Sequence, residues 1–384
     1  MSDKIKIGLI INPIAGMGGS VGLKGSDGAE ILALAREKGA IPNANQRAKE
    51  FLQALNPIKS KISFLTVEGI MGGDLVNALG FNVEFIPSLM ISNHTQIFTT
   101  TPNDTIFTAR EMKNRGITLL MFVGGDGTAR NIFEAVGDGV PCLGIPGGVK
   151  IHSAVFATTP IAAAQLILQY LWGEAPLREA EVLDIDEDAF RHNSVVAKLY
   201  GYLSVPYSPT FSQPSKMSSP ESENEIENQQ GIARWLIEEM ERLGDSWYFL
   251  VGPGTTPRSI AILLSQPKTL LGVDLFHQKR QIKADLNEKE IIEAIEGKKV
   301  KLIVTPIGAQ GFIFGRGNLQ LSSHVLRKVG FDNIIIIASK YKISTIPNNN
   351  LRIDSRDPDF DKEFVGYYRV LVDYGEFRII NVVS

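Results

Sequence analysis

The stretch that most constrains the fold is Val123-Gly124-Gly125-Asp126-Gly127-Thr128, which lies between an apolar segment and a helical pattern. Residues 117–123 before it are almost all apolar, as expected for a buried strand. After it, a spacing of three to four residues puts one apolar face on a helix, formed by Ala129, Ile132, Phe133 and Val136. The sequence therefore predicts a buried strand, a glycine turn and a helix in succession.

The residue types in this turn point to anion chemistry. Its glycines let the backbone approach a bulky anion because no Cβ stands in the way. The helix start behind them offers unpaired N–H groups and a positive dipole end, which suits phosphate. A carboxylate would be repelled there unless a metal ion or a hydroxyl lies beside it, so we predict that Asp126 is catalytic, as a base or as a Mg²⁺ ligand. Turn geometry alone, with Thr128 as a helix cap, is the structural alternative.

Two further glycine clusters follow predicted strands, at 12–19 after Ile5–Ile11 and at 146–150 after Val140–Ile145. Strands alternate with helices up to Trp172, which predicts a parallel, doubly wound sheet with all three clusters at the carboxyl ends of its strands. We predict that nucleotide or phosphate is bound there by Asn12, Gly16, Gly18, Gly19, Gly124, Gly125, Gly127, Thr128, Gly147, Gly148 and Lys150. A solvated surface position is the alternative for Lys150.

Other polar residues near these clusters have simpler interpretations. Asp27 fits a turn better than a metal ligand. His152 is interpreted as a hydrogen-bonded structural residue, and Cys142, the single cysteine, as part of the core.

The length of 384 residues suits two domains. We predict the fold class as α/β, with an N-terminal doubly wound parallel sheet and a second, strand-rich domain. The expected domains are 1–178, which binds nucleotide, 179–350, which binds the acceptor, and C-terminal strands in 351–384 that pack on the first domain or its interface. The polar composition of 204–230 predicts an exposed loop.

Composition narrows the class of protein. The net charge of -3 does not indicate the basic surface that is typical of nucleic-acid-binding proteins. No apolar run reaches the ~20 residues that span a bilayer, and the N-terminus lacks the pattern of a signal peptide. We therefore expect a cytoplasmic protein without membrane or nucleic-acid partners. The spacing of Gly16, Gly18 and Gly19 does not match the dinucleotide fingerprint of an oxidoreductase.

Several segments resemble one superfamily. Gly124–Thr128 resembles the signature of the NAD kinase and diacylglycerol kinase superfamily, and Ile11–Gly16 resembles the segment that follows the first strand in its lipid-kinase branch. Leu302–Gly308 resembles the Thr-Pro-Thr-Gly segment of NAD kinases. With Gly22–Gly28 and Phe314–Asn318, the chain resembles the prokaryotic ATP-NAD kinase-like family over most of its length.

The resemblance implies an NAD kinase-like fold and a kinase that uses ATP or polyphosphate with Mg²⁺. Its implied substrate is NAD, phosphorylated on the adenosine ribose 2′-hydroxyl to give NADP, and we expect a homo-oligomer. The residues expected to bind the acceptor are Thr255, Thr256, Thr305, Gly308 and Arg316. Ala309–Phe312 departs from the family's Ser-Thr-Ala-Tyr, so the acceptor stays open. A lipid or other hydroxyl acceptor, and a non-catalytic nucleotide-binding accessory protein, are the alternatives.

Overall fold

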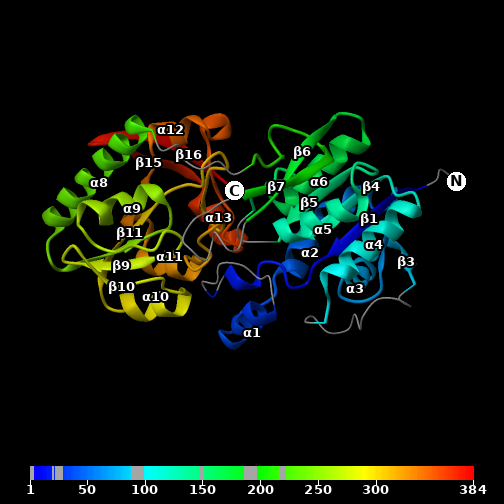
Figure 1. Ribbon diagram of the computed structural model, residues 1–384, viewed down its shortest axis with the longest axis horizontal. Helices are drawn as coiled ribbons and strands as arrows, with labels where there is room; N and C mark the ends of the chain where they lie inside the picture. The colour runs from blue at the N-terminus through cyan, green and yellow to red at the C-terminus, as the bar shows by residue number, and fades with distance from the viewer. Residues whose placement is uncertain are drawn as a thin grey trace. The chain divides into compact units, whose positions relative to one another are not determined.

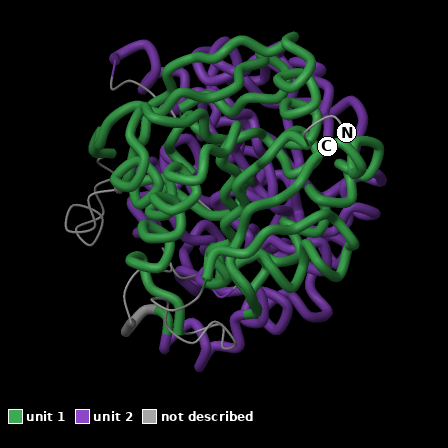
Figure 2. The backbone as a smooth tube through the Cα atoms, turned by 90° about the vertical axis from the view of Figure 1, so that its right-hand side faces the viewer, with its two compact units in different colours: residues 1–17, 26–32, 41–215 green, residues 18–25, 33–40, 216–384 purple. Residues whose placement is uncertain are grey.

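The structure is a computed structural model that forms two compact units, coloured separately in Figure 2. Unit 1 comprises residues 1–17, 26–32 and 41–215, and unit 2 comprises 18–25, 33–40 and 216–384. The structure describes residues 4–19, 21, 29–87, 99–147, 151–185, 197–215 and 222–384.

Unit 1 is built on a parallel sheet of five strands in the order β3-β2-β1-β4-β5 (Figure 1). The strands are β1 (Ile5–Ile11), β2 (Ile62–Val67), β3 (Asn82–Ile86), β4 (Leu119–Gly124) and β5 (Cys142–Pro146). Along β1, Ile7 pairs with Phe64 of β2 on one side and with Leu119 of β4 on the other. The strand order reverses at β1 and β4, which gives the doubly wound topology that the sequence predicts and a switch point between these two strands.

Helices cover both faces of this sheet because β1 is apolar on both sides. Leu9 packs in one core with Phe51 of α2 (Ala44–Ala54) and with α6 (Pro160–Leu171). Ile10 packs in the other core, with α4 (Pro102–Asn114) and α5 (Asp126–Val136). The other helices before β5 are η1 (Met17–Gly19), α1 (Ala29–Glu37), η2 (Asn56–Ile58) and α3 (Gly73–Ala78).

An antiparallel ribbon packs beside α5 in unit 1. It consists of β6 (Leu177–Ile185) and β7 (Ala197–Pro206), which are paired along their length. Val182 of β6 lies in the same core as Ile132 of α5. The ribbon therefore fixes the outer side of the helix that begins with Asp126.

Unit 2 contains a mixed sheet of nine strands in the order β10-β9-β8-β11-β13-β15-β16-β14-β12. The strands are β8 (Trp247–Val251), β9 (Asp274–His277), β10 (Arg280–Lys283), β11 (Lys299–Val304), β12 (Phe312–Phe314), β13 (Ile334–Ile337), β14 (Leu351–Ile353), β15 (Gly366–Asp373) and β16 (Glu376–Val383). β8, β11, β13 and β15 run parallel to one another. The strands of the C-terminal segment 351–384 thus pair within this sheet; the domain boundaries expected at 178 and 350 stay predictions.

Two layers of helices cover the sheet of unit 2. Leu236 of α8 (Glu223–Leu243) and Ile260 of α9 (Thr255–Leu263) pack in one core. Ile291 of α10 (Glu288–Ile295) and Val325 of α11 (Ser323–Val329) pack in the opposite core. Smaller helical segments complete the unit at η3 (Phe331–Asn333), α12 (Lys340–Ser344), η4 (Pro347–Asn349) and α13 (Pro358–Phe364).

The exposed loop predicted over 204–230 is shorter in the structure, where residues 207–215 lie outside helices and strands but both ends of the predicted loop belong to regular elements. β7 continues to Pro206, and α8 begins at Glu223 with Ser222 as its N-cap. The polar side chains of this segment bind one another and the main chain; Gln229 donates to Glu225 at 2.9 Å, and Asn228 donates to the carbonyl of Val372 at 2.8 Å. Polar composition indicated solvent exposure, which is correct for Glu223 and Asn224 but not for the buried Glu225 and Gln229. Residues 216–221 lie outside the described part of the chain.

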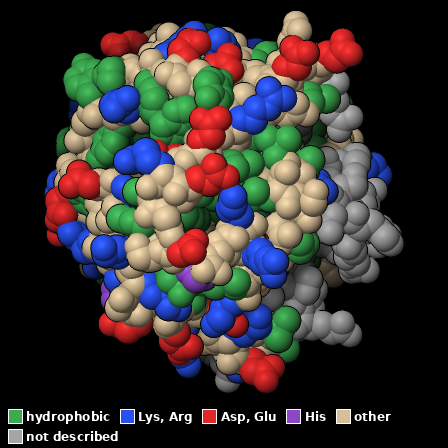
Figure 3. Space-filling model, turned by 90° about the vertical axis from the view of Figure 1, so that its left-hand side faces the viewer, with side chains coloured by type: hydrophobic (Ala, Val, Ile, Leu, Met, Phe, Trp, Pro, Cys, Tyr) green, Lys and Arg blue, Asp and Glu red, His purple; other side chains and the backbone are tan. Residues whose placement is uncertain are grey.

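In the described part of the chain, no helix combines the length and apolar character needed to cross a bilayer. The face drawn in Figure 3 mixes acidic, basic and apolar side chains. Surface ion pairs such as Lys279–Glu241, at 2.7 Å, follow from this mixture and are each of small energetic value.

Candidate functional site

Three turns of unit 1 meet at the carboxyl ends of β1, β4 and β5. The amide of Asn12 donates to the carbonyl of Val123 at 3.0 Å, and the amide of Gly147 donates to the carbonyl of Gly124 at 2.9 Å. A Cβ on Gly147 would lie 3.2 Å from Val123 Cγ1 and 3.6 Å from Ala15 Cβ. The position of Gly147 is therefore in close approach to both other turns, which is the convergence that the sequence predicts.

A side-chain hydrogen bond joins the first two turns. Asn12 Nδ2 donates to Thr128 Oγ1 at 2.9 Å across the switch point. The N-cap of α5 is Gly125, so Thr128 lies inside the helix and its hydroxyl binds Asn12 instead of capping. A Cβ on Gly124 would lie 2.4 Å from that hydroxyl oxygen, so only glycine fits at this position beside Thr128.

A buried arginine supports the third turn. Arg47 of α2 is 5% exposed; its Nε donates to the carbonyl of Pro146 at 3.2 Å, and it pairs with Glu50 at 3.2 Å. The hydrogen bond from Arg47 to Pro146 therefore holds the end of β5 against α2.

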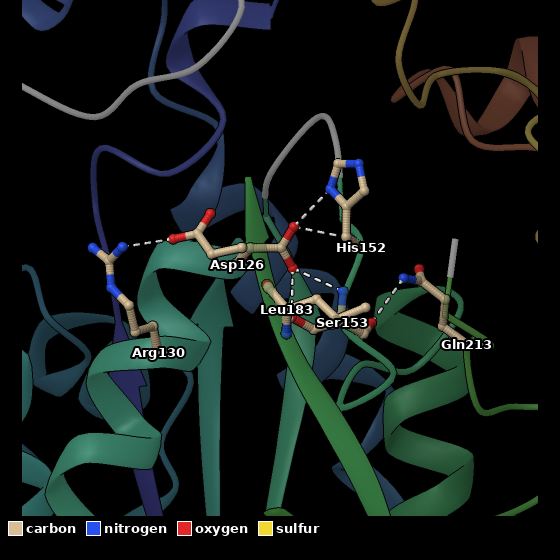
Figure 4. A network of polar contacts seen from close by, with 7 residues as sticks. Asp126, Arg130, His152, Ser153, Leu183 and Gln213 are labelled. Carbon is tan, nitrogen blue, oxygen red and sulfur yellow. Dashed lines mark hydrogen bonds and ion pairs between the residues drawn. The ribbon is translucent and has the colours of Figure 1, made fainter. Parts of the chain in front are cut away.

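Asp126 is the first residue of α5 and is 6% exposed. Its Oδ2 accepts from the amide of His152 at 2.7 Å and lies 3.1 Å from His152 Nδ1. Its Oδ1 accepts from the amide and the hydroxyl of Ser153, at 3.0 and 2.7 Å (Figure 4). The carboxylate thus anchors the segment that follows the third glycine cluster, and His152 has the hydrogen-bonded role that its sequence context indicates.

Ser153 links Asp126 to the ribbon. Its Oγ lies 2.7 Å from the carbonyl of Leu183 in β6 and accepts from the Leu183 amide at 3.0 Å. A serine hydroxyl has one proton, so it can donate either to Asp126 or to the Leu183 carbonyl, but not to both at once. Gln213 Nε2 donates to the Ser153 carbonyl at 3.4 Å and extends the network shown in Figure 4.

An ion pair also joins α5 to β6 of the ribbon. Arg130 lies one turn after Asp126 on α5, and its guanidinium is 2.8 Å from Asp184 of β6. The side chain of Arg130 is 40% exposed, whereas that of Asp184 is 12% exposed. Helix and ribbon are therefore tied together at two levels, through Ser153 and through this pair.

A magnesium ion does not fit directly on Asp126 in this arrangement. Both carboxylate oxygens already face N–H and O–H donors, which would have to move for a cation to bind. The described residues contain no group of three or more His, Cys, Asp or Glu side chains that could hold a metal ion. Asp126 is therefore not a direct metal ligand in this arrangement.

The structure describes only some of the other positions that were predicted to bind nucleotide. Gly16 has a positive φ of 75°, so the first turn uses a conformation that favours glycine. Gly18 and Gly19 lie in η1 and group with unit 2. Gly148, Lys150 and Asp27 lie outside the described residues.

The predicted acceptor-binding residues divide between two places in unit 2. Thr256, which is fully buried, and Thr305, which is partly exposed, both contact the ammonium group of Lys342. Thr255 is exposed at the start of α9, and Gly308 is partly exposed in the turn after β11. Arg316 follows β12, which runs opposite to β11 in the sheet.

Arg316 already has partners within unit 2. It is 2% exposed, its Nε lies 3.8 Å from Asp354, and its guanidinium stacks on Phe312 at 4.3 Å. These contacts bury the guanidinium within unit 2, and the acceptor-binding role expected of Arg316 stays a prediction.

Three residues that make contacts at these places in the structure were not predicted from the sequence: Ser153, Arg47 and Lys342. Ser153 is adjacent to His152, but its role depends on β6, which lies thirty residues away. Lys342 lies in α12, which follows β13 and has Ser339 as its N-cap. This order of strand, turn and short helix resembles that of β8 and α9, so the sequence pattern could have indicated the position of Lys342.

Models of protein families match residues of both units. The model of the ATP-NAD kinase N-terminal domain matches residues 7–175, which contain all three turns, and that of the ATP-NAD kinase C-terminal domain matches residues 259–382. The search of curated proteins and the search of solved structures gave no match.

Proposed function

Because the chain belongs to the ATP-NAD kinase family, we propose that it transfers the γ-phosphoryl group of ATP to the adenosine ribose 2′-hydroxyl of NAD, giving NADP. Polyphosphate is the alternative donor. The substrates are small molecules, as in the family.

The observation that carries this proposal is the convergence of three turns at the switch point of unit 1. Asn12 is hydrogen-bonded to Val123 and Thr128 of the second turn, and Gly147 of the third turn is hydrogen-bonded to Gly124. Glycine turns at the carboxyl ends of parallel strands offer backbone N–H groups to phosphates, and α5 adds the positive end of its dipole. We assign the triphosphate of the donor to this edge. A divalent cation would be held there mainly by phosphate oxygens and water, and would neutralise the charge of the triphosphate.

Asp126 is proposed as the group that accepts the proton of the 2′-hydroxyl. In the transfer, a bond forms between that oxygen and the γ-phosphorus, the bond to the bridging oxygen breaks, and ADP leaves. Ser153 supports this role because its proton has a second acceptor, the Leu183 carbonyl, 2.7 Å away. Turning the proton to Leu183 frees a lone pair on Asp126 Oδ1 for the substrate hydroxyl.

The test is an assay of the purified chain with NAD, Mg²⁺ and either ATP or polyphosphate. NADP is quantified with an NADP-specific dehydrogenase, and we expect it to accumulate with at least one donor. Folded protein that makes no NADP would remove NAD as the acceptor. A phosphorus NMR panel of other hydroxyl compounds, lipids included, then separates a different kinase from an accessory protein that binds nucleotide without turnover.

A matched pair of variants tests the role of Asp126. We expect Asp126→Asn to lower turnover by about 10²-fold or more, since proton transfer contributes on that order. Asp138→Asn is the control, because Asp138 is an exposed carboxylate beyond the other end of α5. Equal activity of the two variants would contradict the assignment.

The cellular setting is also proposed. We place the reaction in the cytoplasm and expect the enzyme to act as a homo-oligomer; light scattering of the purified chain tests the latter, and a monomer at micromolar concentration would overturn it.

A further inference from the structure

Glu225 is a buried carboxylate in the first turn of α8. It is 4% exposed, and its Oε1 accepts a hydrogen bond from Gln229 Nε2 at 2.9 Å. Among the residues that the structure describes, no Lys, Arg or His pairs with Glu225, and its Oε2 accepts no hydrogen bond. A carboxylate that is withdrawn from water without an ion pair is unfavourable. The pairing of this side chain is therefore incomplete.

Helix capping does not account for the burial of Glu225. Ser222 and Glu225 have the spacing of a capping box, in which the later side chain accepts from the N-cap amide. α4 and α10 form such boxes through Asp104 and Glu290. In α8 the Ser222 hydroxyl accepts from the Glu225 amide, but the carboxylate of Glu225 bonds to Gln229 instead. The side chain is thus turned along the helix and into the protein.

The first turn of α8 lies at the carboxyl edge of the sheet in unit 2. α8 leads into β8 and α9 follows it, so both helices run opposite to this strand and begin at the same edge. Ser259 Oγ of α9 lies 3.3 Å from Gln229 Oε1, which places the starts of the two helices side by side (Figure 1). The amide of Lys340, at the start of α12 after β13, donates to Asn228 Oδ1 at 2.9 Å. Ligands of parallel α/β sheets bind at this edge.

The chemistry of this position selects a cation. An ionised carboxylate only accepts hydrogen bonds, and the positive end of the α8 dipole favours negative charge in this turn. A phosphate would be repelled by Glu225. Mg²⁺ takes several oxygen ligands, whereas the described residues hold no group of three or more acidic, His or Cys side chains. A single carboxylate suits a monovalent organic cation better.

Glu225 also lies outside the parts of the chain that the family models cover. Those models match residues 7–175 and 259–382, and α8 lies between the two ranges. The carboxylate is therefore a feature of this chain's own α8, and its role does not follow from the family match.

We propose that Glu225 binds an organic cation at the carboxyl edge of unit 2, and that this cation is the positively charged nicotinamide ring of oxidised NAD. The choice of NAD rests on the proposed function, whereas the cation site rests on the incomplete pairing of Glu225. The site then selects oxidised NAD over NADH, because the reduced ring carries no charge.

The test uses the full chain and isothermal titration with oxidised NAD, with NADH and with the small cation 1-methylnicotinamide. Wild-type protein should bind oxidised NAD about tenfold or more tightly than NADH, because one charge-assisted contact distinguishes them. Glu225→Gln should remove this difference by raising the Kd of oxidised NAD, and should abolish binding of 1-methylnicotinamide. Glu223→Gln is the matched control, since Glu223 is an exposed carboxylate in the same turn, and it should leave the difference unchanged.

The outcomes separate the site from the reaction. Equal affinities of wild-type protein for oxidised NAD and NADH overturn the site, as does a folded Glu225→Gln variant that keeps the difference. If Glu225→Gln does not fold, Glu225→Asp replaces it; a smaller difference supports the site, and an unchanged one overturns it. Displacement of 1-methylnicotinamide by Mg²⁺, but not by Na⁺ at equal ionic strength, assigns Glu225 to an inorganic cation and overturns the proposal. If the difference depends on Glu225 but no NADP is formed, the proposed function fails while the cation site stands. If NADP forms and wild-type protein phosphorylates NADH equally well, the reverse holds.

Discussion

Replacing Ser153 by alanine tests whether the network around Asp126 stabilises unit 1. Ser153 is fully buried, and its Oγ contacts Asp126 Oδ1 at 2.7 Å and the carbonyl and amide of Leu183 at 2.7 and 3.0 Å. With one proton, it makes one donated and one accepted bond at a time. A bond to a charged group contributes about 1.5–3 kcal/mol and a neutral one about 0.5–1.5 kcal/mol. We therefore expect Ser153→Ala to lower the free energy of unfolding of unit 1 by about 2–4 kcal/mol.

Hydrogen exchange followed by mass spectrometry measures this loss for each unit separately. Peptides from β1 and β4 should exchange about 30- to 1,000-fold faster, whereas peptides from β8 should not change. Ser212→Ala is the control, because Ser212 Oγ accepts a single bond, from the Ser208 amide at 3.0 Å; its effect should stay near 1 kcal/mol or below. Less than a threefold change in unit 1 for Ser153→Ala would refute the reasoning.

Three further predictions concern single positions. Gly124→Ala places a Cβ 2.4 Å from Thr128 Oγ1 and should cost about 1–3 kcal/mol by overpacking; thermal melting should show partial rescue by adding Thr128→Ala, and strictly additive losses would contradict the steric cause. Burial raises the pKa of the Cys142 thiol, so a thiol reagent should react with it only in denaturant, and rapid labelling of native protein would be inconsistent with the core assignment. Burial lowers the pKa of Lys268 to about 8 from 10.5, so between these values the unfolded chain binds more protons and the free energy of unfolding should rise with pH. Urea titrations at pH 7.5 and 10 should show that Lys268→Met loses this rise, and an unchanged rise in the variant would assign it to other groups.

The sequence predicts β1, β4 and β5 of unit 1 well because each is a nearly continuous apolar run between polar or glycine-rich segments. Ile5–Ile11 has the predicted bounds, and the strands predicted at 117–123 and 140–145 form at Leu119–Gly124 and Cys142–Pro146. The short strands β10 and β12 were not predicted, because three or four residues carry too little periodicity. β12 also depends on a partner that is distant in sequence, since Phe312 pairs with Arg352 of β14. Tertiary context decides such strands.

The turns of the candidate site were predictable, but the directions of their side chains were not. Glycine and aspartate mark where the backbone turns, and the doubly wound order brings those turns together. The orientation of Asp126 depends on the 151–153 segment and on β6, and Lys342 joins Thr256 only through the pairing of β8, β11 and β13. The sequence likewise did not indicate that the guanidinium of Arg316, which is expected to bind the acceptor, contacts Asp354 and Phe312.

The central claim, that the turns of unit 1 hold the phosphate donor beside Asp126, is tested most directly by a crystal structure with NAD, Mg²⁺ and a non-hydrolysable ATP analogue. We predict that backbone amides of residues 12–16 and 124–127 contact the triphosphate, with the 2′-hydroxyl of NAD hydrogen-bonded to Asp126. A triphosphate bound elsewhere, with Asp126 still held by His152 and Ser153 and remote from both substrates, would contradict the account.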